Sequence, residues 1–181
     1  SHSQKDKMGQ QLGRYLNETF EPGLFDRMKQ RGFPTIPYVN SGGQPPDQGF
    51  TQFLETPRYS TGYAALFQTM GFMTETHMLK PYPQRVRATR EFLDQSIRLL
   101  AEEGVAIQKI RRADRDAYQQ QPRAAIAWEV DRDQPSDLEF HGYEARYVDS
   151  QVTPGKRLFY DRKKPFVRHV PYFNHYRVSR S

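Results

Sequence analysis

The stretch from Gly71 to Tyr82 constrains the fold most, because it places a carboxylate, Glu75, inside an apolar segment. Phe72–Met73 precede this glutamate, Met78–Leu79 follow it, and prolines bound the run, a pattern that predicts a short buried strand. A buried, unpaired carboxylate is costly, so it either finds a partner or changes its pKa. Glu75 is therefore the first candidate for catalysis. A glutamate at the strand end that is solvated or paired with an arginine is the alternative.

Two helices are predicted before this strand. Apolar residues at helical spacing predict the first from Lys7 to Phe20. Glu21–Pro22 is expected to end it and to start the second, because proline is tolerated in the first turn of a helix but not in its interior. Gly32 is expected to end the second helix in a left-handed conformation. The prolines and glycines of Phe33–Asp47 predict a loop.

A long helix is predicted after the strand, from Pro83 to Glu103, with Gly104 as its end. Its buried side is expected to consist of five apolar residues: Val86, Phe92, Leu93, Ile97 and Leu100. Earlier in the chain, Phe50–Leu54 is a predicted strand and Tyr63–Phe67 a predicted helical turn.

The second half of the chain is rich in strand patterns with turn residues between them. The predicted strands are Val105–Ile110, Ala124–Val130, Leu138–Val148, Arg157–Tyr160 and Pro165–Val178, with a helix over Ala113–Gln121. We therefore expect an α/β fold, α+β overall: an α/β sheet domain over residues 1–104 and a small antiparallel β lobe over residues 105–181. The last strand pattern runs almost to the end of the chain, which favours a piece of a larger protein.

The net charge of +6 is concentrated at the end of the chain. Lys156–Ser181 contains eight Lys or Arg residues and one acidic residue, interleaved with aromatic side chains. Such a segment can bind nucleic acid through phosphate contacts and base stacking. It alternates like a strand, however, and carries no nucleic-acid-binding motif, so no nucleic-acid partner is expected.

Several structural classes are excluded by composition. The chain has no cysteine, so it forms neither disulfides nor cysteine-ligated metal sites. No run of 18 apolar residues and no leader pattern is present, so neither a membrane partner nor a signal peptide is expected. Ser1–Ser3 is interpreted as the remnant of a cloning tag, and His2 is assigned no role.

Three short blocks stand in a fixed order before the long helix: Pro57–Tyr63 (Pro-Arg-Tyr-Ser-Thr-Gly-Tyr), Thr74–His77 (Thr-Glu-Thr-His) and Leu79–Tyr82 (Leu-Lys-Pro-Tyr). Together they resemble the bacterial branch of the zinc carboxypeptidases of the carboxypeptidase A family, over roughly Leu12–Leu100. The resemblance implies the C-terminal part of a carboxypeptidase-like catalytic domain, followed by the β lobe. It also implies zinc in the intact protein and a peptide substrate, and it favours a periplasmic or secreted location.

The resemblance assigns roles to Glu75, Arg58 and Tyr59, and the spacing along the predicted strand suggests one for His77. Glu75 corresponds to the glutamate that activates the zinc-bound water and passes its proton to the leaving amine. Arg58 and Tyr59 are the candidates for holding the substrate end, and the planar fork of an arginine suits a carboxylate. A surface arginine beside a packed tyrosine is the alternative. His77 lies two residues from Glu75 and orients that carboxylate if both share a strand face; a core or surface histidine is the alternative.

The zinc ligands of that family are a His-x-x-Glu motif and a distant second histidine. Upstream of Glu75 the sequence contains no histidine except His2. His141–Glu144 spells the motif, but it follows Glu75, and residues three apart in a strand point to opposite faces. No metal ligand is therefore assigned.

The sequence thus predicts a fragment of a zinc-dependent metallocarboxypeptidase that carries the general acid/base but lacks the zinc ligands. This chain alone is expected to bind no catalytic zinc and to cleave nothing. The alternative is a noncatalytic module that binds a peptide, a glycan or a polyanion. A fragment would expose apolar surface, so a homodimer that covers this surface is also expected.

Overall fold

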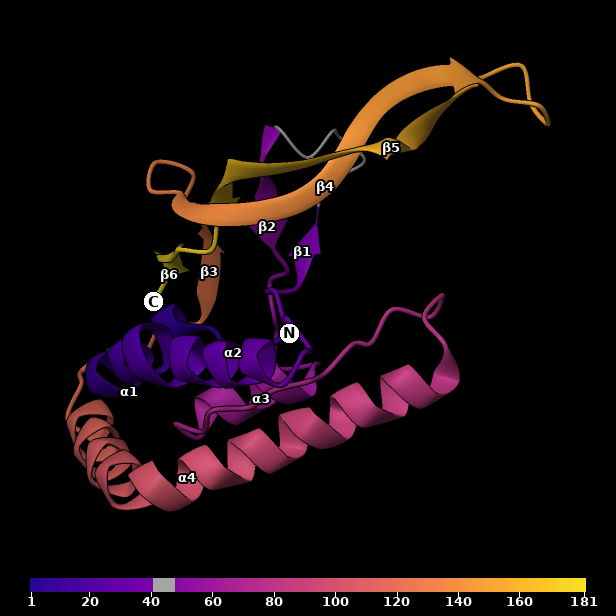
Figure 1. The fold of residues 1–181 in the computed structure, drawn as a ribbon. Helices are drawn as coiled ribbons and strands as arrows, with labels where there is room; N and C mark the ends of the chain where they lie inside the picture. The colour runs from indigo at the N-terminus through magenta and orange to yellow at the C-terminus, as the bar shows by residue number, and fades with distance from the viewer. Residues whose placement is uncertain (41–47) are drawn as a thin grey trace. The chain divides into compact units, whose positions relative to one another are not determined.

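The computed structural model describes residues 1–40 and 48–181 and has an α+β fold, as predicted. The chain forms two compact units. Unit 1 contains Ser1–Tyr38, Phe53–Glu129 and Tyr176–Ser181, and unit 2 contains Val39–Gln52 and Val130–His175 (Figure 1). Residues 41–47, which belong to the predicted loop Phe33–Asp47, lie outside the described residues. None of the helices in the described ranges is long and apolar enough to cross a membrane.

The first part of unit 1 is helical almost without interruption. A 3₁₀ turn (Lys5–Lys7) is followed by α1 (Gln10–Tyr15), a π-helical turn (Leu16–Phe20) and α2 (Glu21–Gln30). The predicted break at Glu21–Pro22 is wrong, because the backbone keeps helical angles through this point. Pro22 is accommodated in the first turn of α2, directly after the wide π turn. Gly32 has a φ of 81°, so the predicted left-handed residue after α2 is confirmed.

The long helix α4 (Tyr82–Gln119) continues well past the predicted end. Gly104 lies inside it, and Val105–Ile110, predicted as a strand, is helical. A Cβ added at Gly104 would meet nothing within 4 Å, so no tight turn requires glycine there. A glycine inside a helix costs only about 1 kcal/mol, and Ile107 and Ile110 extend the packed side of α4 beyond it. The domain boundary expected near Gly104 therefore falls within α4.

The buried side of α4 differs from the predicted one. Its buried residues are Gln95, Leu99, Ile107 and Asp114. Of the five residues expected in the core, only Phe92 packs against it, while Val86, Leu93, Ile97 and Leu100 are exposed. The reason is that α1 and α2 pack on the other side of α4.

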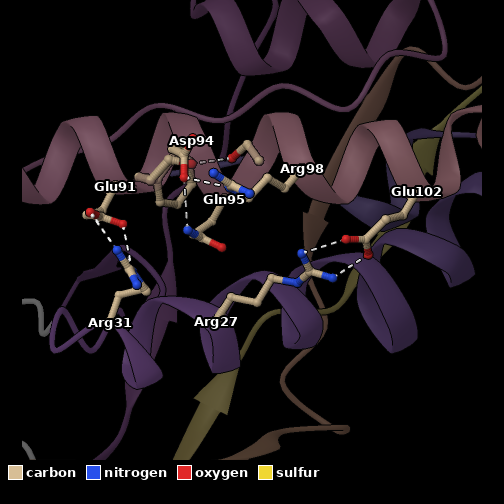
Figure 2. A network of polar contacts seen from close by, with 9 residues as sticks. Arg27, Arg31, Glu91, Asp94, Gln95, Arg98 and Glu102 are labelled. Atoms are coloured by element: carbon tan, nitrogen blue, oxygen red, sulfur yellow. Dashed lines mark hydrogen bonds and ion pairs between the residues drawn. The ribbon is translucent and has the colours of Figure 1, made fainter.

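Arg27 of α2 and Arg31, directly after its end, hold α4 in this orientation (Figure 2). Arg27 makes a two-point ion pair with Glu102, and Arg31 does the same with Glu91 at 3.1 and 3.4 Å. The hydrogen bond from each arginine holds the pKa of its glutamate below the usual value. The core of unit 1 consists of Met8, Leu12, Leu16, Phe20, Leu24, Ala65, Leu99 and Ile107.

Unit 2 is built on a four-stranded sheet with the order β1-β2-β5-β4. The strands are β1 (Val39–Asn40), β2 (Phe50–Gln52), β4 (Ser136–Asp149) and β5 (Lys156–Phe173). β4 and β5 pair antiparallel along their whole length, and β5 pairs parallel with β2. The predicted alternation holds, because Val170 and Tyr172 point to one face and are buried with Phe50.

Two shorter elements complete the described structure. β3 (Ala127–Val130) pairs with β6 (Tyr176–Arg180) in a two-stranded sheet. Helix α3 (Ser60–Leu66) of unit 1 contains most of the predicted turn Tyr63–Phe67. It leads into the segment that carries Glu75 (Figure 1).

Candidate functional site

The segment that carries Glu75 is extended but is not a buried strand, so that prediction is wrong. Among the described residues its only ladder contact is an isolated antiparallel bridge between Phe72 and His2. Met78 and Leu79 are each 79% exposed. A strand needs neighbours that pair its backbone groups and cover its apolar side chains, and one bridge does not supply them. The apolar pattern alone does not show whether such neighbours are present.

Glu75 itself is exposed and makes no hydrogen bond or ion pair within the described residues. The N-terminal ammonium of Ser1, which is attracted by Glu75, donates to the Met73 carbonyl at 2.8 Å. Burial lowers the pKa of this ammonium, and the attraction of Glu75 acts in the opposite direction. The carboxylate of Glu75 is thus accessible, as a general base must be.

Arg58 and Tyr59 lie on the turn that leads into α3. The ring of Tyr59 packs edge-on against Phe53, with centroids 5.0 Å apart, and the amide of Tyr59 donates to Thr56 at 2.9 Å. The guanidinium of Arg58 is exposed and has no partner in the part of the chain that the structure describes. Arg58 is therefore available to a ligand, while Tyr59 is a half-packed aromatic residue.

The buried residue Ser3 joins the segment that leads into α3 to the segment that carries Glu75. Its hydroxyl accepts the Gly71 amide at 2.9 Å and lies 2.9 Å from the Thr61 carbonyl and 3.1 Å from the Thr69 carbonyl. Thr61 is two residues after Tyr59, and Gly71 is four residues before Glu75. Ser3 thus fixes the start of α3 next to the Glu75 segment. Ser1–Ser3, interpreted from the sequence as the remnant of a cloning tag, is thus hydrogen-bonded into unit 1.

Within the described residues, His77 makes no hydrogen bond or ion pair with Glu75. Its Nδ1 accepts a hydrogen bond from the Leu79 amide at 3.2 Å, and its carbonyl accepts the Lys80 amide at 3.0 Å. The imidazole therefore stabilises a local turn. Because the segment is not a strand, His77 and Glu75 do not share a strand face. The role of His77 in orienting Glu75 was inferred from such a face and therefore loses its basis.

No zinc site can be built from the described residues. They contain no group of three or more histidine, aspartate and glutamate residues that could hold a metal ion. Three histidines each contact one carboxylate: His2 with Glu21, His141 with Glu139, and His169 with Asp137. Glu144 pairs with Lys164 instead of sharing an ion with His141. Zinc needs at least three protein ligands, so a pair does not fit it.

Local sequence patterns do not indicate a second polar cluster, because its members are far apart along the chain. The ammonium of Lys7 lies over the rings of Trp128 and Tyr176, at 5.5 and 5.8 Å from their centroids, and donates to the Glu55 carbonyl. Glu55 is only 2% exposed, and its amide donates to Gln4. Burial lowers the pKa of Lys7 to about 8, although Glu55 attracts the charge. Burial also raises the pKa of Tyr176.

We expect the stability of unit 1 to rise between pH 8 and 10 because of Lys7. The folded-state pKa of Lys7, about 8, lies below its ordinary value of 10.5. Between these two pH values the unfolded chain therefore binds more protons than the folded chain, and the free energy of unfolding rises with pH. Tyr176 opposes the rise only above about pH 10, where the unfolded phenol ionises first. The free energy of unfolding, measured with urea, should rise by an amount on the order of 1 kcal/mol from pH 7.5 to 9.5.

The change Lys7→Met should remove this gain. Lys29→Met is the matched control, because Lys29 is an exposed lysine of α2, and it should keep the gain. Equal pH profiles for the wild type and Lys7→Met would contradict the assignment.

No family model, no curated protein and no solved structure matches this chain. The site therefore rests on the geometry above and on the resemblance of its short sequence blocks.

Proposed function

We propose that this chain is part of a carboxypeptidase-type hydrolase and supplies its acid/base group and its substrate-holding residues. The observation behind the proposal is the buried Ser3 hydroxyl, which links Thr61, three residues after Arg58, to Gly71, four residues before Glu75. Both charged side chains are exposed and have no hydrogen-bond partner within the described residues. A site for a peptide end needs such a free cation and a free carboxylate.

In the proposed reaction Glu75 accepts a proton from a water molecule while the water oxygen attacks the scissile carbonyl. Glu75 then gives this proton to the leaving amine as the peptide bond breaks. Arg58 donates two parallel hydrogen bonds to the terminal carboxylate of the substrate. Tyr59 packs beside this carboxylate. His77 keeps the turn after Glu75 in place.

The zinc ion that the resemblance implies does not fit the described residues, so no step is derived through it. If the intact hydrolase contains zinc, its ligands lie on other polypeptide. This chain by itself should therefore take up no stoichiometric zinc and should release no C-terminal residue from peptides. A metal analysis of the dialysed chain that finds one zinc per molecule would contradict this part of the proposal.

The test of the proposal is Glu75→Gln in the intact hydrolase that contains this chain. Release of C-terminal residues from peptides should fall by at least about 100-fold, because the amide cannot accept the proton. The thermal midpoint should not change, because Glu75 is exposed. Glu18→Gln, at another exposed glutamate, is the matched control and should keep full activity.

Arg58→Ala should raise KM more than it lowers kcat, because it removes contacts to the substrate end. Full activity in Glu75→Gln would overturn the role of Glu75. Absence of any carboxypeptidase activity in the unaltered intact protein would overturn the proposed function.

A further inference from the structure

β4 and β5 continue as a two-stranded ribbon beyond the rest of their sheet (Figure 1). β4 is at the edge of the sheet, and on its other side β5 pairs with β2 only through Tyr172 and Phe173. β4 and β5 remain paired with each other as far as Asp149 and Lys156. Within the described residues, no third strand pairs with the segments 140–149 and 156–168. These two segments and the turn between them are called here the ribbon.

The ribbon is basic, and most of its cations are unpaired. Between Phe140 and Arg168 the sequence has seven Lys or Arg residues and three acidic residues. Of the seven cations, Lys164 alone makes an ion pair within the described residues, with Glu144. The other six are exposed and have no carboxylate partner in the part of the chain that the structure describes: Arg146, Lys156, Arg157, Arg162, Lys163 and Arg168. A group of exposed cations without carboxylate partners attracts a polyanion.

Three of these arginines lie on one face of the ribbon, each against a phenylalanine ring. The guanidiniums of Arg146 and Arg157 lie 5.5 and 5.8 Å from the centroid of the Phe159 ring, and that of Arg168 lies 4.4 Å from the centroid of Phe166. Residues paired across antiparallel strands share a face, so the register of β4 and β5 places all five side chains together. Each planar guanidinium can donate two hydrogen bonds to a phosphate.

The form of the ribbon favours a nucleic-acid duplex among the polyanions. The major groove of B-DNA is about 12 Å wide and admits a two-stranded β-ribbon. A ribbon without neighbouring strands can enter the groove, and its arginines then lie close to the phosphates of the groove walls. From the sequence no nucleic-acid partner was expected, because the basic segment alternates like a strand and matches no motif. In the structure this alternation is that of a free ribbon.

We propose that the ribbon binds double-stranded DNA, with its two strands in the major groove and with Arg146, Arg157 and Arg168 on the phosphates. These contacts go to the backbone, which every DNA sequence presents, so binding does not depend on the base sequence. The other unpaired cations of the ribbon add further attraction for the phosphates. This proposal does not depend on the proposed function.

The test is the fluorescence anisotropy of a labelled duplex of about 20 base pairs, titrated with this chain at about 50 to 200 mM salt. The logarithm of the association constant should fall with the logarithm of the salt concentration, with a slope between about −3 and −5, because each phosphate contact releases counterions. The triple variant Arg146→Ala, Arg157→Ala, Arg168→Ala should weaken binding at about 50 mM salt by at least about 100-fold. Its slope should be shallower by about 3.

The matched control is the triple variant Arg14→Ala, Arg87→Ala, Arg90→Ala. These arginines are exposed residues of α1 and α4 in unit 1, so the control loses the same net charge and keeps the ribbon. Its affinity for the duplex should stay within about 2-fold of the wild type, because salt screens charges that lie away from the DNA.

A second ribbon variant keeps the test decisive if the loss of the stacked arginines disturbs the hairpin. The side chains of Lys156, Arg162 and Lys163 make no ion pair and no ring contact within the described residues, so their change to serine should leave the circular dichroism spectrum unchanged. This triple variant should weaken binding at about 50 mM salt by at least about 10-fold.

Three results would overturn the proposal. The first is a wild type that does not bind the duplex at about 50 mM salt. The second is a control variant that loses as much affinity as the ribbon variants, which would show that net charge alone decides. The third is tighter binding of a single strand of the same length than of the duplex, which would contradict the fit to a groove.

Discussion

Replacing Asp114 by alanine is expected to lower the free energy of unfolding of unit 1 by about 3 kcal/mol. Asp114 is on α4 and is only 4% exposed, and its carboxylate accepts the backbone amides of Leu12 at 2.6 Å and Gln11 at 3.3 Å. These amides belong to the first turn of α1, where a helix has no internal acceptors and where negative charge is favourable. Alanine would leave them without a partner in the core.

The measurement is urea unfolding followed by fluorescence of Trp128, which is the only tryptophan and lies in unit 1. Asp114→Asn keeps one acceptor oxygen, so it should lower the free energy of unfolding less than Asp114→Ala does. Asp116→Ala, at an exposed position of the same helix, should change stability by less than about 0.5 kcal/mol. Similar losses for Asp114→Ala and Asp116→Ala would show that the carboxylate does not cap α1.

The same contact explains why Gly9 precedes α1. A Cβ added at this position would lie 2.3 Å from the Cβ of Asp114. The close approach of α4 to the start of α1 therefore requires a residue without a side chain. The sequence contains both residues, but nothing in their local patterns connects positions 9 and 114.

Local patterns predicted the structure where neighbouring residues decide it. Gly32 ends α2 because a left-handed residue suits glycine, and the alternation in Leu138–Val148 corresponds to β4. The predicted strand Pro165–Val178 is divided between β5, which ends at Phe173, and β6, which begins at Tyr176. Gly104 was misleading, because the apolar positions after it continue the packed side of α4. Here tertiary packing outweighs the low helix propensity of one glycine.

The side of α4 that is buried could not be predicted for a different reason. The sequence of this helix has apolar residues on two sides, and the positions of α1 and α2 decide which side is covered. The arrangement of the candidate site could not be predicted for the same reason. The sequence indicated Arg58, Tyr59 and Glu75, but it could not show that Ser3 joins their segments. That contact links residues 58 and 68 positions apart.

Leu24→Ala is expected to lower the free energy of unfolding by about 3 kcal/mol, whereas Leu79→Ala should change it by less than about 0.5 kcal/mol. Leu24 is 0% exposed in the core of unit 1, so truncation leaves a cavity in addition to the lost apolar contacts. Leu79 is 79% exposed, so the same truncation removes little buried surface. Urea unfolding of both variants, followed by Trp128 fluorescence, compares one substitution in two environments.

This pair of variants also tests how the Glu75 segment is packed in the chain itself. The apolar pattern of Gly71–Tyr82 predicted a buried strand, and in such a strand Leu79→Ala would cost at least about 2 kcal/mol. A loss of that size would show that the segment is covered in solution and that Glu75 lies next to a buried surface. A small loss would agree with the exposed segment seen here, in which the carboxylate of Glu75 is open to solvent.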